Sequence, residues 1–259
     1  MSHHKASDRR MGYKGWCYVL CGLTILFFVF WISSPENLSF KWDENVAIDL
    51  KNDFVKVNFS VDKQEVHTSV YTRQRTPSKS MGKEILFLHG QVFSSQVWED
   101  TGALTFLAEH GFRSVAVDLP GHGLSEPLQI LKDDKSRASF LLALIKALRM
   151  QQTVLVSPSM SGMYSLPFLM EYSQYLSAFI PIAPAYTEYY STVAYKSVQT
   201  RTLIAYGDAD TGLGEESLKH LMLLPNHEIF KIPQAKHAAY VDQPILFQEK
   251  ISTFLSSSP

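Results

Sequence analysis

The sequence predicts an α/β fold, in which a mostly parallel sheet is covered by helices on both faces. Short, continuously apolar strand patterns alternate with helical patterns along residues 54–256. Strands of this kind are typical of parallel sheets buried on both sides. The notable polar motifs all follow the ends of these strands, where parallel sheets bind ligands. A chain of 259 residues, of which 46% are hydrophobic, can bury one sizeable core.

The first expected elements are two amphipathic strands, Phe54–Val61 and Glu65–Thr72, joined by a turn into an antiparallel hairpin. Buried strands and helices then alternate to the end of the chain. In order, they are a strand at Lys83–Leu88, a helix at Gln96–His110 closed by Gly111, a strand at Arg113–Asp118, a helix at Ser136–Met150, a strand at Thr153–Val156, a helix at Ser161–Tyr172, strands at Ala178–Ile182 and Thr202–Tyr206, a helix at Glu215–Leu223, a strand at Glu228–Ile232 and a helix at Pro244–Leu255.

The N-terminal region predicts a membrane anchor. Trp16–Ile32 carries no charge and is rich in Leu, Ile, Phe and Val, at the short end of the range for a spanning helix. Basic residues precede it, and none follows until Lys41. The positive-inside rule therefore places a tail at 1–15 in the cytosol. We expect a transmembrane signal anchor at 16–32, a stalk at 33–53 and a lumenal or extracellular domain at 54–259. A cleaved signal peptide is the alternative.

Two sequons lie beyond this segment, with Asn37 and Asn58 as glycan acceptors if this side is lumenal. Both cysteines, Cys17 and Cys21, lie inside the apolar segment, so the predicted domain has neither a disulfide nor a thiolate nucleophile. The net charge of −1, with no basic run beyond the N-terminus, argues against a nucleic-acid partner.

Residues 157–161, with the sequence SPSMS, match a strand-to-helix turn that presents a serine nucleophile. The turn is so tight that the residues two before and two after the nucleophile must be small, and both are usually glycine. Here Ser157 and Ser161 take those places and Ser159 lies at the centre. The pattern is degenerate, and Ser161 is a second candidate nucleophile, so its meaning depends on the other motifs.

Two motifs follow earlier strands. His89 and Gly90 precede Gln91, whose backbone N–H can form an oxyanion hole with the N–H of Met160. An ordinary glycine turn is the alternative. Asp118 begins a Pro-Gly turn after the next strand, and we expect it to support the structure through local hydrogen bonds.

A carboxylate and a histidine complete the candidate catalytic residues. Asp210 follows the strand at Thr202–Tyr206 and is a better acid than Asp208, which lies tighter in the turn. A calcium loop is the alternative, but no acidic residue follows at the required spacing. His237 lies in the loop after the last strand. Ser159, Asp210 and His237 thus appear in the order Ser, Asp, His that is typical of α/β-hydrolases.

The chain resembles the α/β-hydrolase superfamily over roughly residues 54–256 and, within it, the family of α/β-hydrolase domain-containing protein 14. The motifs that carry this resemblance are SPSMSGMYSLPFL at 157–169, DLPG at 118–121, YGD at 206–208 and LPNH at 224–227. The family has a soluble B form and a membrane-anchored A form, and the apolar N-terminal segment is similar to the A form. The resemblance implies that Ser159 is the nucleophile, Asp210 the acid and His237 the base. Members of the resembled family share the departure from G-x-S-x-G.

These features predict a membrane-anchored serine hydrolase that needs no cofactor or metal. Only residues 183–201 separate two strands where many α/β-hydrolases insert a lid, so we expect an open site. Tyr186, Tyr189, Tyr190 and Tyr195 lie in this segment and either line one wall or pack at the surface. An open site suits small acyl esters, thioesters or N-acyl amines, including those attached to larger carriers. A catalytically silent adhesion or scaffold domain is the alternative function.

Overall fold

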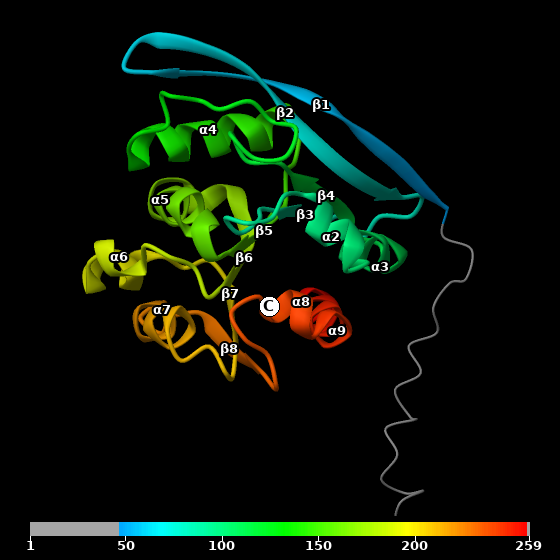
Figure 1. Ribbon diagram of the computed structural model, residues 1–259, viewed down its shortest axis with the longest axis vertical. Helices are drawn as coiled ribbons and strands as arrows, with labels where there is room; N and C mark the ends of the chain where they lie inside the picture. Colours follow the sequence, from blue (N-terminus) through cyan, green and yellow to red (C-terminus); the bar gives the residue numbers. More distant parts are fainter. Residues whose placement is uncertain (1–46, 258–259) are drawn as a thin grey trace, which may run out of the picture. The chain divides into compact units, whose positions relative to one another are not determined.

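The structure is a computed structural model that describes residues 47–257 (Figure 1). This part of the chain folds around an eight-stranded sheet in the order β1-β2-β4-β3-β5-β6-β7-β8. The strands are β1 (Ile48–Val61), β2 (Gln64–Pro77), β3 (Glu84–Phe87), β4 (Arg113–Val117), β5 (Thr153–Pro158), β6 (Leu176–Ile182), β7 (Thr202–Gly207) and β8 (His227–Ile232). Each adjacent pair of strands from β4 to β8 is parallel, whereas β2 pairs in antiparallel orientation with both β1 and β4. The predicted mostly parallel sheet is confirmed.

Helices cover both faces of the sheet (Figure 1). One face carries α4 (Asp134–Ala147), α5 (Gly162–Tyr172), α6 (Thr192–Ser197) and α7 (Leu213–Leu221), and the other carries α2 (Gln96–Asp100), α3 (Ala103–Glu109), α8 (Ala239–Asp242) and α9 (Pro244–Ser256). Alternate residues of a strand pack into two hydrophobic cores, one on each face of the sheet. In β3, Leu86 packs on the α4 side, while Ile85 and Phe87 pack on the α3 side. This alternation on a fully buried strand explains its continuous apolar pattern.

The β1–β2 hairpin is longer than the sequence predicts. β1 begins at Ile48 rather than Phe54, so residues 48–53 of the predicted stalk are strand. Their side chains are mostly exposed, and pairing with β2 rather than apolar burial keeps them extended. Because only Thr72–Arg75 of β2 pairs with β4, the rest of the hairpin projects as an arm that packs over α4 (Figure 1).

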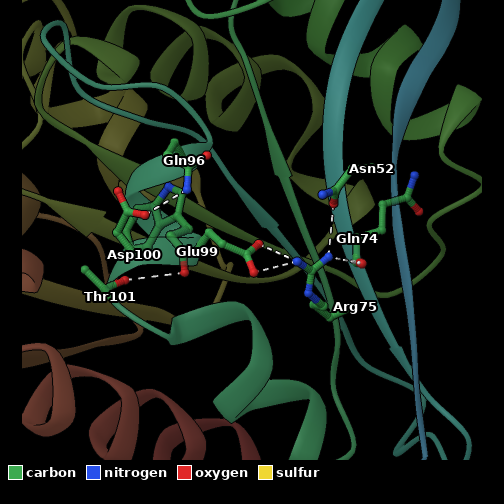
Figure 2. A network of polar contacts seen from close by, with 8 residues as sticks. Asn52, Gln74, Arg75, Gln96, Glu99, Asp100 and Thr101 are labelled. Atoms are coloured by element: carbon green, nitrogen blue, oxygen red, sulfur yellow. Dashed lines mark hydrogen bonds and ion pairs between the residues drawn. The ribbon is translucent and has the colours of Figure 1, made fainter.

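The predicted helix at Gln96–His110 is wrong, because the chain forms two short helices there. Gly102 between α2 and α3 adopts a φ of 76°, a left-handed conformation that glycine tolerates and that interrupts a helix. Figure 2 shows how α2 is held against β2. Both carboxylate oxygens of Glu99 accept bonds from Arg75 Nη2, at 2.6 and 2.5 Å. Arg75 Nη1 donates to Asn52 Oδ1 and to the Gln74 carbonyl, so this nearly buried guanidinium is well satisfied.

The segment between β6 and β7 contains only the 3₁₀ turn η3 (Thr187–Tyr189) and α6, which agrees with a minimal lid. Tyr195 is fully buried and its hydroxyl donates to the Thr187 carbonyl, so it packs in the core and does not line a site wall. Tyr190 donates to Asp134 at the start of α4. Tyr189 is largely exposed.

The expected tail at 1–15, the anchor at 16–32 and Asn37 lie outside the described residues. Within residues 47–257, the structure has no helix that is both long and apolar enough to span a membrane. Asn58 lies on β1, where it is exposed.

Candidate active site

The structure brings Ser159, Asp210 and His237 together at the carboxyl edge of the parallel strands. His237 Nε2 lies 2.8 Å from Ser159 Oγ, and His237 Nδ1 lies 2.7 Å from Asp210 Oδ2. Asp210 is buried, Ser159 is half-buried, and 43% of the His237 side chain is exposed. An imidazole bonded to a buried carboxylate on one nitrogen can accept the hydroxyl proton on the other.

The serine turn is tight and its backbone is strained. Ser159 follows β5 with a φ of 50°, in the left-handed region that non-glycine residues rarely adopt. Its carbonyl accepts a bond from the Ala185 N–H, which ties the turn to the segment after β6. A side-chain carbon on Gly162 would lie 2.2 Å from the Ala185 carbonyl oxygen, so the close approach at this point requires glycine.

A chain of buried hydroxyl groups lies beneath the nucleophile. Ser157 Oγ donates to Ser165 Oγ at 2.6 Å and lies 3.0 Å from Ser161 Oγ. Ser161 Oγ donates to the Pro158 carbonyl at 2.7 Å. All three serines are fully buried. Ser161 is therefore a structural member of the turn, and its hydroxyl is not presented to solvent as a nucleophile.

The loops that carry Asp210 and His237 are joined by backbone bonds. Ala209 N–H donates to the Ala235 carbonyl, and Asp208 N–H donates to the Ile232 carbonyl. A side-chain carbon on Gly207 would lie 2.2 Å from a carbonyl oxygen of the histidine loop, so glycine permits this approach. The Asp208 side chain, in contrast, is exposed. These contacts fix Asp210, not Asp208, against His237.

The loop after β3 passes beside the nucleophile. A side-chain carbon on Gly90 would lie 3.6 Å from Ser159 Cβ and 3.8 Å from the Tyr240 hydroxyl. Within the described residues, the N–H of Gln91 donates to no protein acceptor. Met160 lies at the start of η1 (Ser159–Ser161), where the first N–H groups of a helix lack partners within it. Both N–H groups can therefore serve an oxyanion.

His89 holds this loop in place, a role that the sequence analysis did not assign to it. The Leu119 N–H donates to His89 Nε2 at 3.0 Å, so the proton of the neutral ring lies on Nδ1, which donates to the Gly90 carbonyl at 2.9 Å. Burial lowers the pKa of His89 to about 4, which keeps the ring neutral. The His-Gly pair at a strand end was the signal available in the sequence.

Asp118 ties the same loop to the turn after β4, as expected of a structural residue. Its nearly buried carboxylate accepts bonds from the Ser95 N–H at 2.7 Å and from the Leu124 N–H at 2.8 Å. A side-chain carbon on Gly123 would overlap this carboxylate. Together, His89 and Asp118 connect the loops that follow β3 and β4.

Two further histidines in the C-terminal half of the chain bond to groups away from the triad. His220 Nδ1 lies 2.9 Å from Thr187 Oγ1, and His227 Nδ1 bonds the Leu224 carbonyl. Among residues 47–257, no group of three or more His, Cys, Asp or Glu side chains is arranged to hold a metal ion.

Comparisons with known proteins agree with this architecture. Residues 85–170 match the Alpha/beta hydrolase family. Protein ABHD14A from Danio rerio is 44% identical over 193 residues, which cover 72% of each chain. The chain belongs to the ABHD14 family. The "Putative protein-lysine deacylase ABHD14B" from Homo sapiens is 40% identical over 192 residues, covering 72% of this chain and 90% of that protein.

The solved structures support the same fold at much lower identity. A predicted CIB-like hydrolase from Thermoplasma acidophilum aligns with a TM-score of 0.70 and 22% identity, over 81% of this chain and 99% of that one. The carboxylesterase CesB from Bacillus subtilis aligns with a TM-score of 0.69 and 15% identity, over 90% of this chain and 99% of that one. The family match and the ABHD14 relatives identify this chain as an α/β-hydrolase-type enzyme.

Proposed function

We propose that this protein is a serine hydrolase in which Ser159, His237 and Asp210 form the catalytic triad. The observation that carries the proposal is the continuous hydrogen-bonded line from Asp210 Oδ2 through both His237 nitrogens to Ser159 Oγ. Groups from three separate loops meet in this line, and each loop follows its own strand. Such a line activates a hydroxyl group for attack on an acyl carbonyl.

The reaction proceeds in two halves. His237 Nε2 removes the proton of Ser159 as its oxygen attacks the carbonyl carbon, and the Gln91 and Met160 N–H groups stabilise the oxyanion, by about 3 kcal/mol for each donor. The tetrahedral intermediate collapses as His237 returns the proton to the leaving group, which leaves an acyl-enzyme. Water, deprotonated by His237, then attacks the acyl carbon, and His237 passes that proton to Ser159 Oγ as the bond to the acyl group breaks and the acid is released.

The substrate is a small ester, thioester or N-acyl amine that can be attached to a larger carrier. The short segment between β6 and β7 supports this, since it leaves no cap to enclose a long chain. A hollow of about 620 Å³ beside the loop after β3 has a mixed lining, in which Phe93, Val97 and Val241 lie with the polar residues Ser94, Gln96, Asp100 and Thr101, and none of the three triad residues lines it. The name of the human ABHD14B relative, which refers to protein-lysine deacylation, is consistent with the N-acyl amine class.

A fluorophosphonate probe tests the nucleophile. We expect the purified full-length protein to be labelled and the Ser159→Ala variant to be unlabelled, while Ser161→Ala keeps its labelling. A folded wild-type protein that does not react would favour the catalytically silent scaffold. Labelling that persists in Ser159→Ala and disappears in Ser161→Ala would assign the nucleophile to Ser161.

A chain-length series of p-nitrophenyl esters tests the substrate class. We expect the highest kcat/KM with short acyl groups, because the site lacks an enclosing lid. Highest activity with long acyl chains would contradict an open site for small acyl groups.

We also propose that the enzyme is a type II membrane protein with its catalytic domain on the lumenal or extracellular side. The uncharged run at 16–32 and the basic residues before it support this topology. Treatment with a glycosidase should shift the protein on a gel if Asn37 or Asn58 carries a glycan. Resistance to glycosidase, together with cleavage of the domain by protease added to the cytosolic side, would reverse the topology.

A further inference from the structure

β1 is an edge strand whose outer backbone groups face away from β2. The Ala47 carbonyl accepts a bond from the Ser78 N–H across the hairpin, and the pairing then runs to the turn without a shift. Bonding alternates along an antiparallel strand, so odd-numbered β1 residues bond β2 and even-numbered ones point outward. Lys56, Asn58 and Ser60 therefore direct their N–H and C=O groups outward. Within residues 47–257, no other segment bonds these groups.

These outward-facing residues line a groove beside α4. The groove has a volume of about 540 Å³ and is bounded on β1 by Lys56, Asn58 and Ser60, with Phe59 between them, and on the other side by the half-buried and exposed face of α4. Its α4 wall consists of Ser139, Leu142, Ala143, Lys146 and Ala147. Figure 1 shows the hairpin arm lying over α4. A strand edge alongside a helix is the geometry in which proteins bind an extended peptide as an additional strand.

The charges around the groove select the kind of peptide. Lys56 lies on the strand side and Lys146 on the helix side, and no Asp or Glu is among the residues that line the groove. Lysine on an edge strand disfavours pairing with the same edge of a second copy, because like charges then approach. The same lysines attract an acidic partner.

We propose that the groove between β1 and α4 binds an acidic peptide segment in extended conformation, which adds to the sheet as a ninth strand beside β1. The peptide backbone bonds the outward groups of Lys56, Asn58 and Ser60, and its acidic side chains pair with Lys56 and Lys146. A glycan on Asn58 would occupy the same edge, so glycosylation at this sequon and peptide binding exclude each other. This site is separate from the triad, and its test does not depend on catalysis.

The experiment uses full-length protein made in bacteria, so that Asn58 carries no glycan. The probe is a short fluorescein-labelled peptide of alternating Glu and Val, and the control peptide has Lys in place of Glu. We expect fluorescence anisotropy to show salt-sensitive binding of the acidic peptide only. Hydrogen exchange should slow at the amides of Lys56, Asn58 and Ser60 when the peptide is present. Equal binding of both peptides, or no binding at about 1 mM, would overturn the proposal.

A matched pair of variants tests the backbone contact. Asn58→Pro removes one outward N–H and leaves the β1–β2 bonds intact, since proline is tolerated on an edge strand where its missing donor faces solvent. Asn58→Gln keeps that N–H. We expect about tenfold weaker peptide binding in Asn58→Pro, with wild-type binding in Asn58→Gln and unchanged esterase activity in both. A folded Asn58→Pro protein that binds like Asn58→Gln would disprove strand addition.

Charge reversal provides an independent measurement if Asn58→Pro does not fold. Lys56→Glu and Lys146→Glu should each weaken binding of the acidic peptide by about tenfold and strengthen binding of the basic one. Lys51→Glu is the control, because Lys51 lies on β1 but not among the residues that line the groove. Weakening of the same size in Lys51→Glu would show that binding is a general charge effect and not docking in the groove.

Discussion

Polar groups are bonded within the protein at the carboxyl edge of the sheet, whereas they point outward along the free edge of β1. At the carboxyl edge, the buried side chains of His89, Asp118 and Ser157 are bonded within the protein. Along β1, the backbone of Lys56 and Asn58 points outward to a groove. A reaction needs groups that are fixed before the substrate arrives, whereas strand addition needs unpaired backbone groups. Substitutions that loosen the fixed groups in and around the carboxyl edge should therefore cost activity or stability.

The largest effect is expected at the acid of the triad. Asp210→Asn should lower kcat by about 10⁴-fold, because an amide at this place no longer favours the imidazole tautomer that accepts the serine proton. Steady-state kinetics with a short p-nitrophenyl ester measures it. Asp208→Asn is the matched control and should retain activity, since its side chain is exposed. If the two variants lose activity equally, the carboxylate has been assigned to the wrong residue.

The next effect concerns the contribution to stability of the contact between α2 and β2. Glu99→Ala should lower the free energy of unfolding by about 3 kcal/mol, because it leaves the nearly buried Arg75 guanidinium without its carboxylate. Urea denaturation measures the loss. The matched control is Lys135→Ala, which removes the partner of Asp62 from an exposed ion pair at a helical position and should leave the midpoint unchanged. Similar losses in both variants would show that burial of the pair does not matter.

An effect no larger than that of Glu99→Ala should appear in the pH dependence of stability. Burial lowers the pKa of His89 from 6.5 to about 4, so the unfolded chain binds more protons between these values. The stabilisation is complete above pH 6.5 and is lost as the pH falls toward 4, by up to about 3 kcal/mol. His89→Asn should flatten this part of the curve of unfolding free energy against pH. An unchanged slope would indicate that His89 is protonated in the folded protein.

The smallest effect is expected from the serines beneath the nucleophile. Ser157→Gly combined with Ser161→Gly restores the common G-x-S-x-G pattern without steric conflict but removes the bond from Ser161 to the Pro158 carbonyl. We expect kcat to fall by about tenfold with little change in KM, because a looser turn misplaces the Ser159 hydroxyl. Restoring Ser161 alone should recover most of the activity. A double variant with wild-type kcat would show that the hydroxyl groups only fill space.

The sequence predicted much of this architecture because the central strands, β3 to β7, are short and almost entirely buried. Continuous apolar runs in strands such as β3 and β5 identified a parallel sheet, and the loops that follow β5, β7 and β8 identified Ser159, Asp210 and His237 as the candidate residues. Their close approach follows from topology, since the carboxyl ends of parallel strands share one edge. The catalytic roles of these residues stay a prediction until the probe experiment is performed.

The features that the sequence did not predict depend on tertiary contacts. Residues 48–53 are polar and irregular in pattern, and only pairing with β2 extends them. Gly102 interrupts a helix although the apolar periodicity continues through it. The bonds of His89 to Leu119 and to Gly90 join loops that follow different strands, so no local pattern reveals them.

At Ser159, the backbone conformation that presents the nucleophile also lowers the stability of the fold. Its φ of 50° would suit glycine, so Ser159→Gly should relieve strain and yield an inactive protein that melts at a higher temperature than the enzyme. Selection for thermal tolerance alone would therefore tend to remove the nucleophile. An engineer who wants a more robust enzyme should seek stabilising changes away from this turn and accept its strain as part of the active state.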